Sequence, residues 1–420
     1  MRKKLTVAAL AFASLFPSAA AAQESADVLA RMKALEDRIK MLEAEVQMLK
    51  SQQAAEAAAL TAVAQAPAPA QAPAPAPAQL PSGPQAPSTL GGAGPAAAKV
   101  LNPDIAVIGD FLGAAGNGAN RVTPALEMHE SEAAFQAILD PYARADFFLS
   151  FGEHGVDLEE GYVTFPALPG GIQLRAGKMR AAFGKVNTLH NHVLPWTDRP
   201  LVTQNLVGGE DGIDDAGLSV SRIFSGPKQI FLEGAAQLFR GDSENLFRSF
   251  KRSDISTVEH FRAYRDITES TNLDVGASYS RGHSVIGPDV INQLYGIDAT
   301  VRWKPLRRAI YHSFVGRTEY VWSRIHQPLI TRTPSGYYIS GDYQFARRWF
   351  VGGRFDRSQR LNNDALLQDT GGSLVLTYWP SEFSQIRGQL RRTRYGENLS
   401  ANEFLFQFQF SIGAHGAHPF

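Results

Sequence analysis

The stretch that decides the fold lies near the C-terminus and reads EFLFQFQFSI over residues 403–412. Apolar Phe404, Phe406, Phe408, Phe410 and Ile412 alternate there with Leu405, Gln407, Gln409 and Ser411. On an extended strand, this alternation creates one apolar face and one mostly polar face. In a soluble sandwich the apolar face meets a second sheet, whereas in an outer-membrane barrel it meets lipid and the polar face lines a wet interior.

The same period of two recurs upstream and predicts sixteen strands in all, to within about two. Clear examples lie at residues 143–151, 172–176, 229–238, 273–280, 295–303, 337–345 and 385–391. Weaker ones begin near Ile105, Glu132, Leu158, Ala216, Val258, Ile310, Arg348 and Gly372. An even number of strands lets both ends of a bacterial barrel lie in the periplasm. We therefore predict an all-β, transmembrane antiparallel β-barrel of about 16 strands over residues 104–420.

The connections between these strands alternate in length. Short ones fall at residues 140–141, 166–170, 225–228, 267–271, 305–308, 346–347 and 380–382. Except for 152–157, the others are longer: 113–131, 180–215, 241–257, 282–291, 323–335, 358–370 and 395–402. Short periplasmic turns and long extracellular loops are typical of outer-membrane barrels. A soluble sandwich, the alternative fold, has no reason to separate its loops in this way.

The composition excludes several classes of protein. The chain has 420 residues and no cysteine, so disulfide frameworks and thiolate sites are excluded. Its 41 basic residues balance 41 acidic ones, which argues against a nucleic-acid partner. It also lacks an uncharged apolar run long enough for a membrane-spanning helix.

Three segments precede the barrel in sequence. Residues 1–22 combine a charged start, an apolar core and small residues, as a signal peptide does. Residues 23–60 carry a heptad seam that predicts a periplasmic parallel coiled coil of two or three chains, formed by Val28, Met32, Leu35, Ile39, Leu42, Val46 and Leu49. The alternative is an amphipathic helix packed on its own chain. Residues 61–103 form a Pro/Ala-rich linker, expected to be largely polyproline II.

Charges of both signs occupy the predicted inward positions. The cations are Arg144, Arg175, Arg302, Arg317, Arg354, Arg387 and Arg391, and the carboxylates are Glu160, Glu233, Asp274, Asp298, Glu319, Asp342 and Asp356. Ionised groups can face an interior only where water or partners reach them. A barrel of about sixteen strands is wide enough for an aqueous channel.

The longest loop, residues 180–215, is expected to fold into the lumen and narrow the pore, since long loops in compact folds are usually functional. The charged residues predicted at this constriction are Lys178, Arg180, Lys185, Arg199, Glu210 and Asp211. His190 and His192 share one side of an extended segment and could supply two metal ligands. The alternative is that they are ordinary polar loop residues. His415 and His418 invite the same metal hypothesis, and the sequence predicts no other cofactor.

Two stretches carry a resemblance to known families. LEEGYVT (158–164), LPGGIQLRAGKMR (168–180) and Phe183-Gly184 resemble the phosphate-selective porin O/P type. LHNHVLPWTDRPL (189–201) resembles the zinc-regulated outer-membrane receptors, which also carry an N-terminal helix and a His-x-His in this loop. The resemblance implies a barrel that assembles as a trimer with one pore per subunit. The lysine ladder of phosphate-selective members is absent from the sequence.

These features predict a porin of the bacterial outer membrane, in contact with its lipid, for passive diffusion of small polar or ionic solutes. The alternatives are a zinc- or metal-linked receptor or transport barrel, and an envelope tether whose coiled coil binds peptidoglycan or another component. An energised receptor would need about 22 strands and a plug. The histidines show no partner pattern of a hydrolase, so we expect no enzymatic activity.

Overall fold

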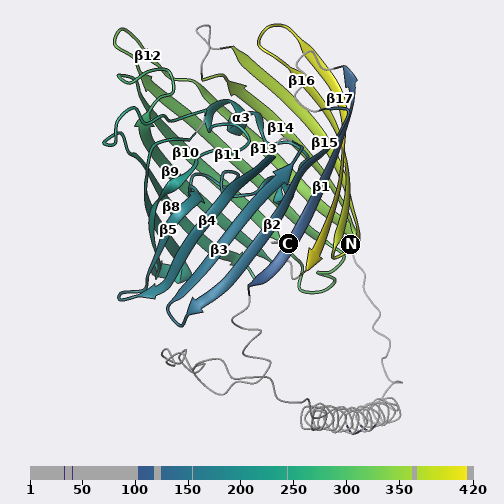
Figure 1. The fold of residues 1–420 in the computed structure, drawn as a ribbon. Coiled ribbons are helices and arrows are strands. Elements are labelled where there is room, and N and C mark those ends of the chain that lie inside the picture. The colour runs from purple at the N-terminus through teal and green to yellow at the C-terminus, as the bar shows by residue number, and fades with distance from the viewer. Residues whose placement is uncertain are drawn as a thin grey trace, which may run out of the picture. The chain divides into compact units, whose positions relative to one another are not determined.

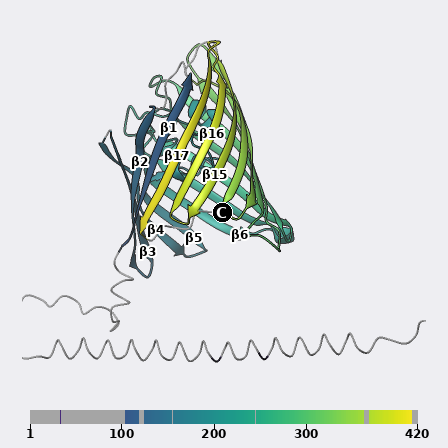
Figure 2. The ribbon, with the colours of Figure 1, turned by 90° about the vertical axis from the view of Figure 1, so that its right-hand side faces the viewer.

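A computed structural model of the chain describes residues 33, 40, 103–117, 124–153, 155–243, 245–361 and 367–413. Its strands form one antiparallel sheet that closes on itself, because β1 pairs with both β2 and β17 (Figures 1 and 2). Of 17 strands, β12 (Thr331–Arg332) has two residues and pairs only with the end of β11, so sixteen strands form the wall. The predicted sixteen-stranded barrel is confirmed.

The wall strands run in sequence order around the barrel (Figure 1). They are β1 (Asp104–Asn117), β2 (Leu126–Asp140), β3 (Ala143–Gly152), β4 (Gly155–Leu168), β5 (Ile172–Arg180), β6 (Asp214–Ser225), β7 (Phe231–Phe239), β8 (Ser256–Thr268), β9 (Thr271–His283), β10 (Ile291–Trp303), β11 (Ser313–His326), β13 (Ser335–Ala346), β14 (Trp349–Gln359), β15 (Gln368–Ser381), β16 (Ser384–Arg394) and β17 (Ser400–Gly413). A 3₁₀ turn, η2 (Pro227–Gln229), connects β6 to β7.

The alternation of residues 403–412 separates the inner and outer faces of β17. Phe404 is 45% exposed and Ile412 is 63% exposed, whereas Leu405 and Gln407 inside are 2% and 1% exposed. Other strands present large apolar side chains outward in the same way, among them Phe147, Leu218, Phe261, Ile297, Ile339 and Leu374. An apolar wall of this extent is stable only against lipid.

Aromatic side chains gather at both ends of this outer wall. Tyr295 stacks on Trp322, with ring centroids 5.3 Å apart, in the halves of β10 and β11 distant from their connection at residues 304–312. Trp349 stacks on Tyr378 at 4.4 Å beside the short turn between β13 and β14. Such belts mark the two membrane–water interfaces of outer-membrane barrels.

Some boundaries differ from the predicted ones. β2 begins at Leu126 rather than near Glu132, because a bulge opposite Asp110 and Phe111 breaks the alternation around His129. The connection before β11 covers residues 304–312 and is longer than expected, since that strand begins only at Ser313. Residues 153–154 join β3 and β4 directly, the short exception that the sequence indicated.

The inner face is less uniformly polar than predicted. Over β7–β13, the ends of the strands farther from the short turns bury apolar side chains inside the barrel, namely Phe239, Val258, Leu294, Val321, Ile325 and Tyr338. They pack against Phe183, Trp196 and Leu206 of the loop between β5 and β6. An apolar core therefore fills part of the lumen and excludes water from that side of the barrel interior.

Apart from Lys33, Lys40 and Pro103, the predicted signal peptide, coiled coil and Pro/Ala-rich linker lie outside the described residues, as do His415 and His418. Within the described part of the chain, no helix has both the length and the apolar character needed to cross a membrane.

Candidate functional site

Residues 181–213, here called the constriction loop, leave the wall after β5 and return at β6. The loop contains a 3₁₀ turn, η1 (Asn191–Val193), and the short helix α3 (Leu201–Leu206), which lies within the ring of strands (Figure 1). Its hydrogen bonds reach strands on opposite sides of the barrel, from β2 and β4 to β11, β14 and β16. The loop therefore crosses the lumen.

The first residues of the constriction loop are anchored through their backbone. The N–H groups of Lys185 and Val186 both donate to Glu319 Oε1, at 2.6 and 2.8 Å, and the N–H of Gly184 donates to Ser278 Oγ at 2.9 Å. Gly184 has φ 60°, and a Cβ there would lie 2.9 Å from a Glu319 oxygen. Only glycine satisfies both the turn and this close approach.

Asp198 anchors the far side of the loop. Its Oδ2 accepts hydrogen bonds from Arg354 at 3.0 Å and Arg391 at 2.8 Å. Burial raises the pKa of Asp198, but these two guanidinium groups outweigh it and lower the pKa to about 2. The carboxylate therefore stays ionised over the whole range in which a bacterial envelope works.

Trp196 fills the space between the loop and the wall. It is fully buried, meets Tyr338 edge-on with centroids 5.3 Å apart, and lies under the guanidinium of Arg354 at 4.8 Å. Its backbone carbonyl accepts a hydrogen bond from Arg387 at 3.1 Å. Apolar packing and charge-assisted hydrogen bonds thus fix the same residue.

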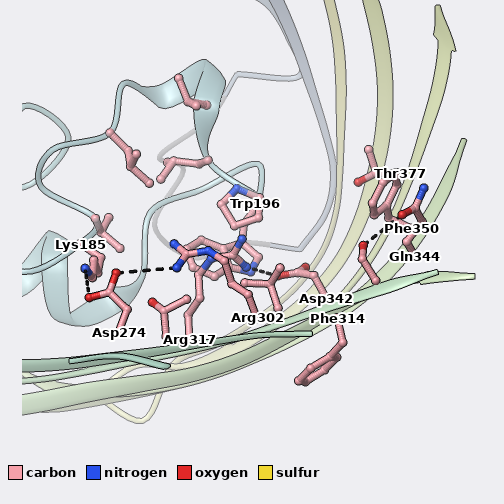
Figure 3. Close-up of a pocket in the computed structure, with 18 of the residues that line it drawn as sticks. Lys185, Trp196, Asp274, Arg302, Phe314, Arg317, Asp342, Gln344, Phe350 and Thr377 are labelled. Carbon is pink, nitrogen blue, oxygen red and sulfur yellow. Dashed lines mark hydrogen bonds and ion pairs between the residues drawn. The ribbon is translucent and has the colours of Figure 1, made fainter. Parts of the chain in front are cut away.

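Beside the loop, towards the short turns, the barrel encloses a cavity of about 1190 Å³ (Figure 3). Among the described residues that line it, eight carry a cationic side chain: Lys185, Arg262, Arg302, Lys304, Arg317, Arg347, Arg348 and Arg387. Four carry a carboxylate: Glu233, Asp274, Asp342 and Glu382. The lining is therefore cationic although the whole chain is neutral.

The carboxylates of this cavity are shared among several cations. Asp274 ion-pairs with Lys185 at 3.0 Å and Arg262 at 2.7 Å, and Arg302 approaches it at 3.7 Å (Figure 3). Asp342 pairs with Arg317 at 2.5 Å. Arg262 also pairs with Glu233 at 3.3 Å, and Lys185 lies 3.7 Å from Asp298, so three carboxylates balance these three cations. The positive excess of the lining therefore comes from its other cations, Lys304, Arg347, Arg348 and Arg387, against Glu382.

Four of the residues predicted at the pore line this cavity: Lys185, Arg302, Arg317 and Arg387. Three others, Glu319, Arg354 and Arg391, anchor the constriction loop. Glu319 binds the backbone of Lys185, and both arginines bind Asp198. Glu319 and Arg354 are buried, whereas Arg391 is partly exposed. Lys185, Arg302 and Arg317 thus line the cavity with partly exposed side chains, whereas Arg387 is buried and also holds Trp196.

The other predicted pore residues lie elsewhere. Arg199 is 2% exposed and donates to Val186 O and Leu189 O, so it braces the loop internally, and burial lowers its pKa to about 9. Arg180 at the end of β5 donates to Asp211 O at 2.8 Å.

Lys178 and Arg175 of β5 also lie away from the cavity lining. Lys178 pairs in register with Gly161 and Ala216 on the outer face and ion-pairs with Asp214 at 3.1 Å. It lies three residues after the inward Arg175, and an odd separation puts it on the opposite face of the strand. Arg175 lies over the ring of Tyr162 at 5.3 Å.

Arg144 and Glu210 occupy exposed positions. Arg144 is half exposed and pairs with Asp146 near the short turn between β2 and β3. Glu210 accepts a hydrogen bond from Asn191 Nδ2 at 3.0 Å, and its carboxylate lies 2.7 Å from His129 Nε2.

The two loop histidines meet carboxylates of the wall. His190 Nδ1 lies 2.5 Å from Glu132 Oε2 and its Nε2 lies 2.6 Å from Glu160 Oε1. Glu132, His190 and His192 each offer a ligand atom, all within 4.8 Å of one another. Burial lowers the pKa of His190, but hydrogen bonds to three carboxylates raise it well above its ordinary value.

A protein of similar sequence, rather than a family model, shows the family of this chain. No family model matches it. An uncharacterized protein of Aquifex aeolicus (strain VF5) is 30% identical over 338 residues, which cover 70% of this chain and 70% of that protein. The chain belongs to the family of this Aquifex protein.

Several solved structures share the barrel fold of this chain. An anion-selective porin from Comamonas acidovorans matches with a TM-score of 0.53 and 9% identity, over 74% of this chain and 99% of the porin. Pseudomonas putida OprB matches with 0.54 and 11% identity, over 75% and 95%. Salmonella typhi OmpF matches with 0.51 and 9%, over 75% and 99%. The fold of this chain is thus the closed β-barrel that these solved structures share.

Several residues of the site were not predicted from the sequence. Asp198 and Trp196 lie inside the quoted loop but carry no pattern that distinguishes an anchor from a solvated side chain. Glu159 reaches the interior because a bulge in β4 pairs Phe148 with Glu160 and Leu149 with Leu158, leaving Glu159 between them. Arg262 could have been found, since it alternates with outward Phe261 on β8.

Proposed function

We propose that this chain is a porin through which small polar solutes, preferentially anions, diffuse passively across the outer membrane. The excess of cationic over acidic side chains on the cavity lining carries the proposal. A confined passage lined by one sign of charge concentrates counter-ions at its mouth and excludes ions of the same sign. The constriction loop sets the width of this passage.

The chemistry of the lining favours oxyanions within that class. Guanidinium groups bind planar and tetrahedral oxyanions through two parallel N–H donors. Of the eight cations that line the cavity, five are arginines that a solute can meet. They lie near Asp274 and Asp342 or at the short turns, and they are Arg262, Arg302, Arg317, Arg347 and Arg348. The resemblance to the phosphate-selective porin type points the same way. The Comamonas protein with the same fold is named as anion-selective.

Reversal potentials in planar bilayers under a KCl gradient test this selectivity. We expect the full chain to pass chloride in preference to potassium, and Arg302→Gln to lower that preference a few-fold, since one charge at ~4 Å in water is worth about 1 kcal/mol. Lys251→Gln, in the exposed connection after β7, is the matched control and should leave it unchanged. A cation-selective wild type would contradict the proposal, and potassium phosphate in place of KCl would show whether oxyanions pass.

We further propose that the chain forms a homo-oligomer, a trimer as in the family it resembles, and that residues 23–60 contribute to its assembly. The heptad seam and the three opposite-charge pairs beside it support a coiled coil between copies. The same segment could hold the barrel near peptidoglycan or another envelope component. Deleting residues 23–60 should lower the oligomer mass in detergent, and an unaltered mass would assign assembly to the barrel wall.

A further inference from the structure

Five buried side chains meet where the constriction loop touches β2 and β4. His190 and His192 come from the loop and Glu132 from β2, while Glu159 and Glu160 come from β4. None of the five is more than 8% exposed. This cluster shares no residue with the charged side chains of the cavity lining or with the anchors of the loop at Glu319 and Asp198.

We propose that His190, His192, Glu132 and Glu159 bind a divalent transition-metal ion, with zinc as the best fit, that fastens the constriction loop to the barrel wall. This inference goes beyond solute diffusion and does not depend on it. Two imidazoles with one or two carboxylates are a common ligand set for zinc in proteins.

The distances fit such a site after small side-chain rotations. Zinc bonds of about 2.0–2.2 Å place ligand atoms roughly 3.3 Å apart in a tetrahedron. The ligand atoms of His190, His192 and Glu132 lie within 4.8 Å of one another, with His192 Nδ1 at 3.6 Å from Glu132 Oε2. His190 Nδ1 and Glu132 Oε2 lie 2.5 Å apart, and a bound metal would take the place of the proton between them.

Glu159 supplies an independent observation. Its Oε2 lies 3.0 Å from His190 Nδ1, while its Oε1 is buried and has no hydrogen-bond partner among the described residues. A buried carboxylate oxygen without a partner is costly, because burial removes the water that it would otherwise bind. A metal ion between Glu159 and the two histidines would satisfy this oxygen.

The surroundings orient the ligands as in known metal centres. Glu160 Oε1 lies 2.6 Å from His190 Nε2, which leaves Nδ1 as the nitrogen that faces the proposed metal. Glu160 Oε2 is itself held by the backbone N–H of Arg180 at 3.0 Å. The guanidinium of Arg180 pairs with Glu159 at 3.3 Å and offsets part of the negative charge.

The position of the cluster defines what the metal would do. The ligands come from two wall strands and from the loop at η1, so one ion would connect three segments distant in sequence. Asp198 holds the loop on the opposite side of the lumen. The metal ion and Asp198 would then attach the loop to opposite sides of the barrel wall, and the width of the passage between them would stay constant.

Isothermal titration of the full mature chain with ZnCl₂, after removal of metals with a chelator, tests the site. His415→Ala/His418→Ala serves as the background, so that terminal histidines do not contribute. We expect one zinc ion per chain, lost in His192→Ala and in Glu132→Gln. Glu160→Gln should bind zinc about 10- to 100-fold more weakly, the usual effect of removing a group that orients a ligand.

His326→Ala is the matched control, because His326 lies on β11 beside Gln293 and far in register from the cluster. It should retain wild-type zinc binding. A wild-type chain without stoichiometric zinc binding, or a His192→Ala variant that binds as tightly as wild type, would overturn the proposal. Heat-modifiable migration in gels verifies that each variant is folded, and if His192→Ala fails it, the milder Glu160→Gln decides.

Discussion

At the scale of single residues, Asp198 is the side chain on which the position of the constriction loop most depends. It joins two arginines of different strands, Arg354 of β14 and Arg391 of β16, and is itself 12% exposed. Arg354 also packs over Trp196, so the ion pair and the apolar contact support each other. Removing one partner of such a buried pair leaves the others charged and without compensation.

Asp198→Asn should therefore lower the stability of the folded barrel by about 3 kcal/mol at pH 7. Because the pKa of Asp198 is depressed to about 2, its contribution is complete above the ordinary value near 3.8 and is lost only as the pH falls through about 2. The wild type should thus keep this stabilisation at pH 4. The temperature at which the heat-modifiable band shifts, recorded at pH 4 and pH 7, measures both effects.

Asp242→Asn provides the control, since Asp242 pairs with exposed Arg240 outside the lumen. It should change that temperature by little, as exposed ion pairs contribute 0–1 kcal/mol. An Asp198→Asn barrel as stable as wild type at pH 7 would show that the ion pairs do not hold the loop.

Prediction from sequence worked unevenly at this scale. Alternation predicted that Arg302, Arg317 and Arg387 face inward, because each lies on a strand whose other face is apolar. It could not show that Arg199 turns back to bind loop carbonyls, since loop residues have no period. Nor could it exclude Lys178, which stands near a strand end where a long side chain reaches the rim from the outer face.

At the scale of elements, the constriction loop is a packed structure and not a flexible connection. Trp196, Val202, Leu206 and Ile213 are fully buried against the inner wall. Loops with a core of their own of this kind are usually functional. Removing the constriction loop would expose the arginines and carboxylates of the inner wall to water, which can solvate them.

Deleting residues 186–210 should raise single-channel conductance, because the loop crosses the lumen. Recording the deletion variant in planar bilayers beside the wild type measures the change. Deleting residues 328–330 is the control, since Leu329 in that connection is 99% exposed and lies outside the passage. Equal conductance of wild type and the 186–210 deletion would mean that the loop does not narrow the pore.

Strands were predictable from sequence where lipid sets one face. The outer surface must be apolar at every second residue, so β17 and β10 could be predicted from residues such as Phe406 and Ile297. Bulges removed that signal at His129 in β2 and at Glu159 in β4. Where the constriction loop packs on the wall, the inner face is also apolar, as at Leu294 and Val321, so the strands there show no alternation of apolar and polar residues.

At the scale of the whole molecule, a neutral chain separates its charges in space. Cations predominate on the cavity lining, whereas carboxylates gather on the inner side of the first four strands, at Asp110, Glu127, Glu132, Asp146, Glu159 and Glu160. Composition cannot reveal this separation, because barrel closure brings together residues from strands that are distant in sequence. A transverse field across the lumen follows from it.

Single-channel recording of the full chain in planar bilayers tests most directly whether this barrel is an open porin. The account predicts discrete, long-lived conductance steps that disappear when the sample is heated enough to unfold the barrel. A refolded barrel with normal heat-modifiable migration that never conducts would contradict it.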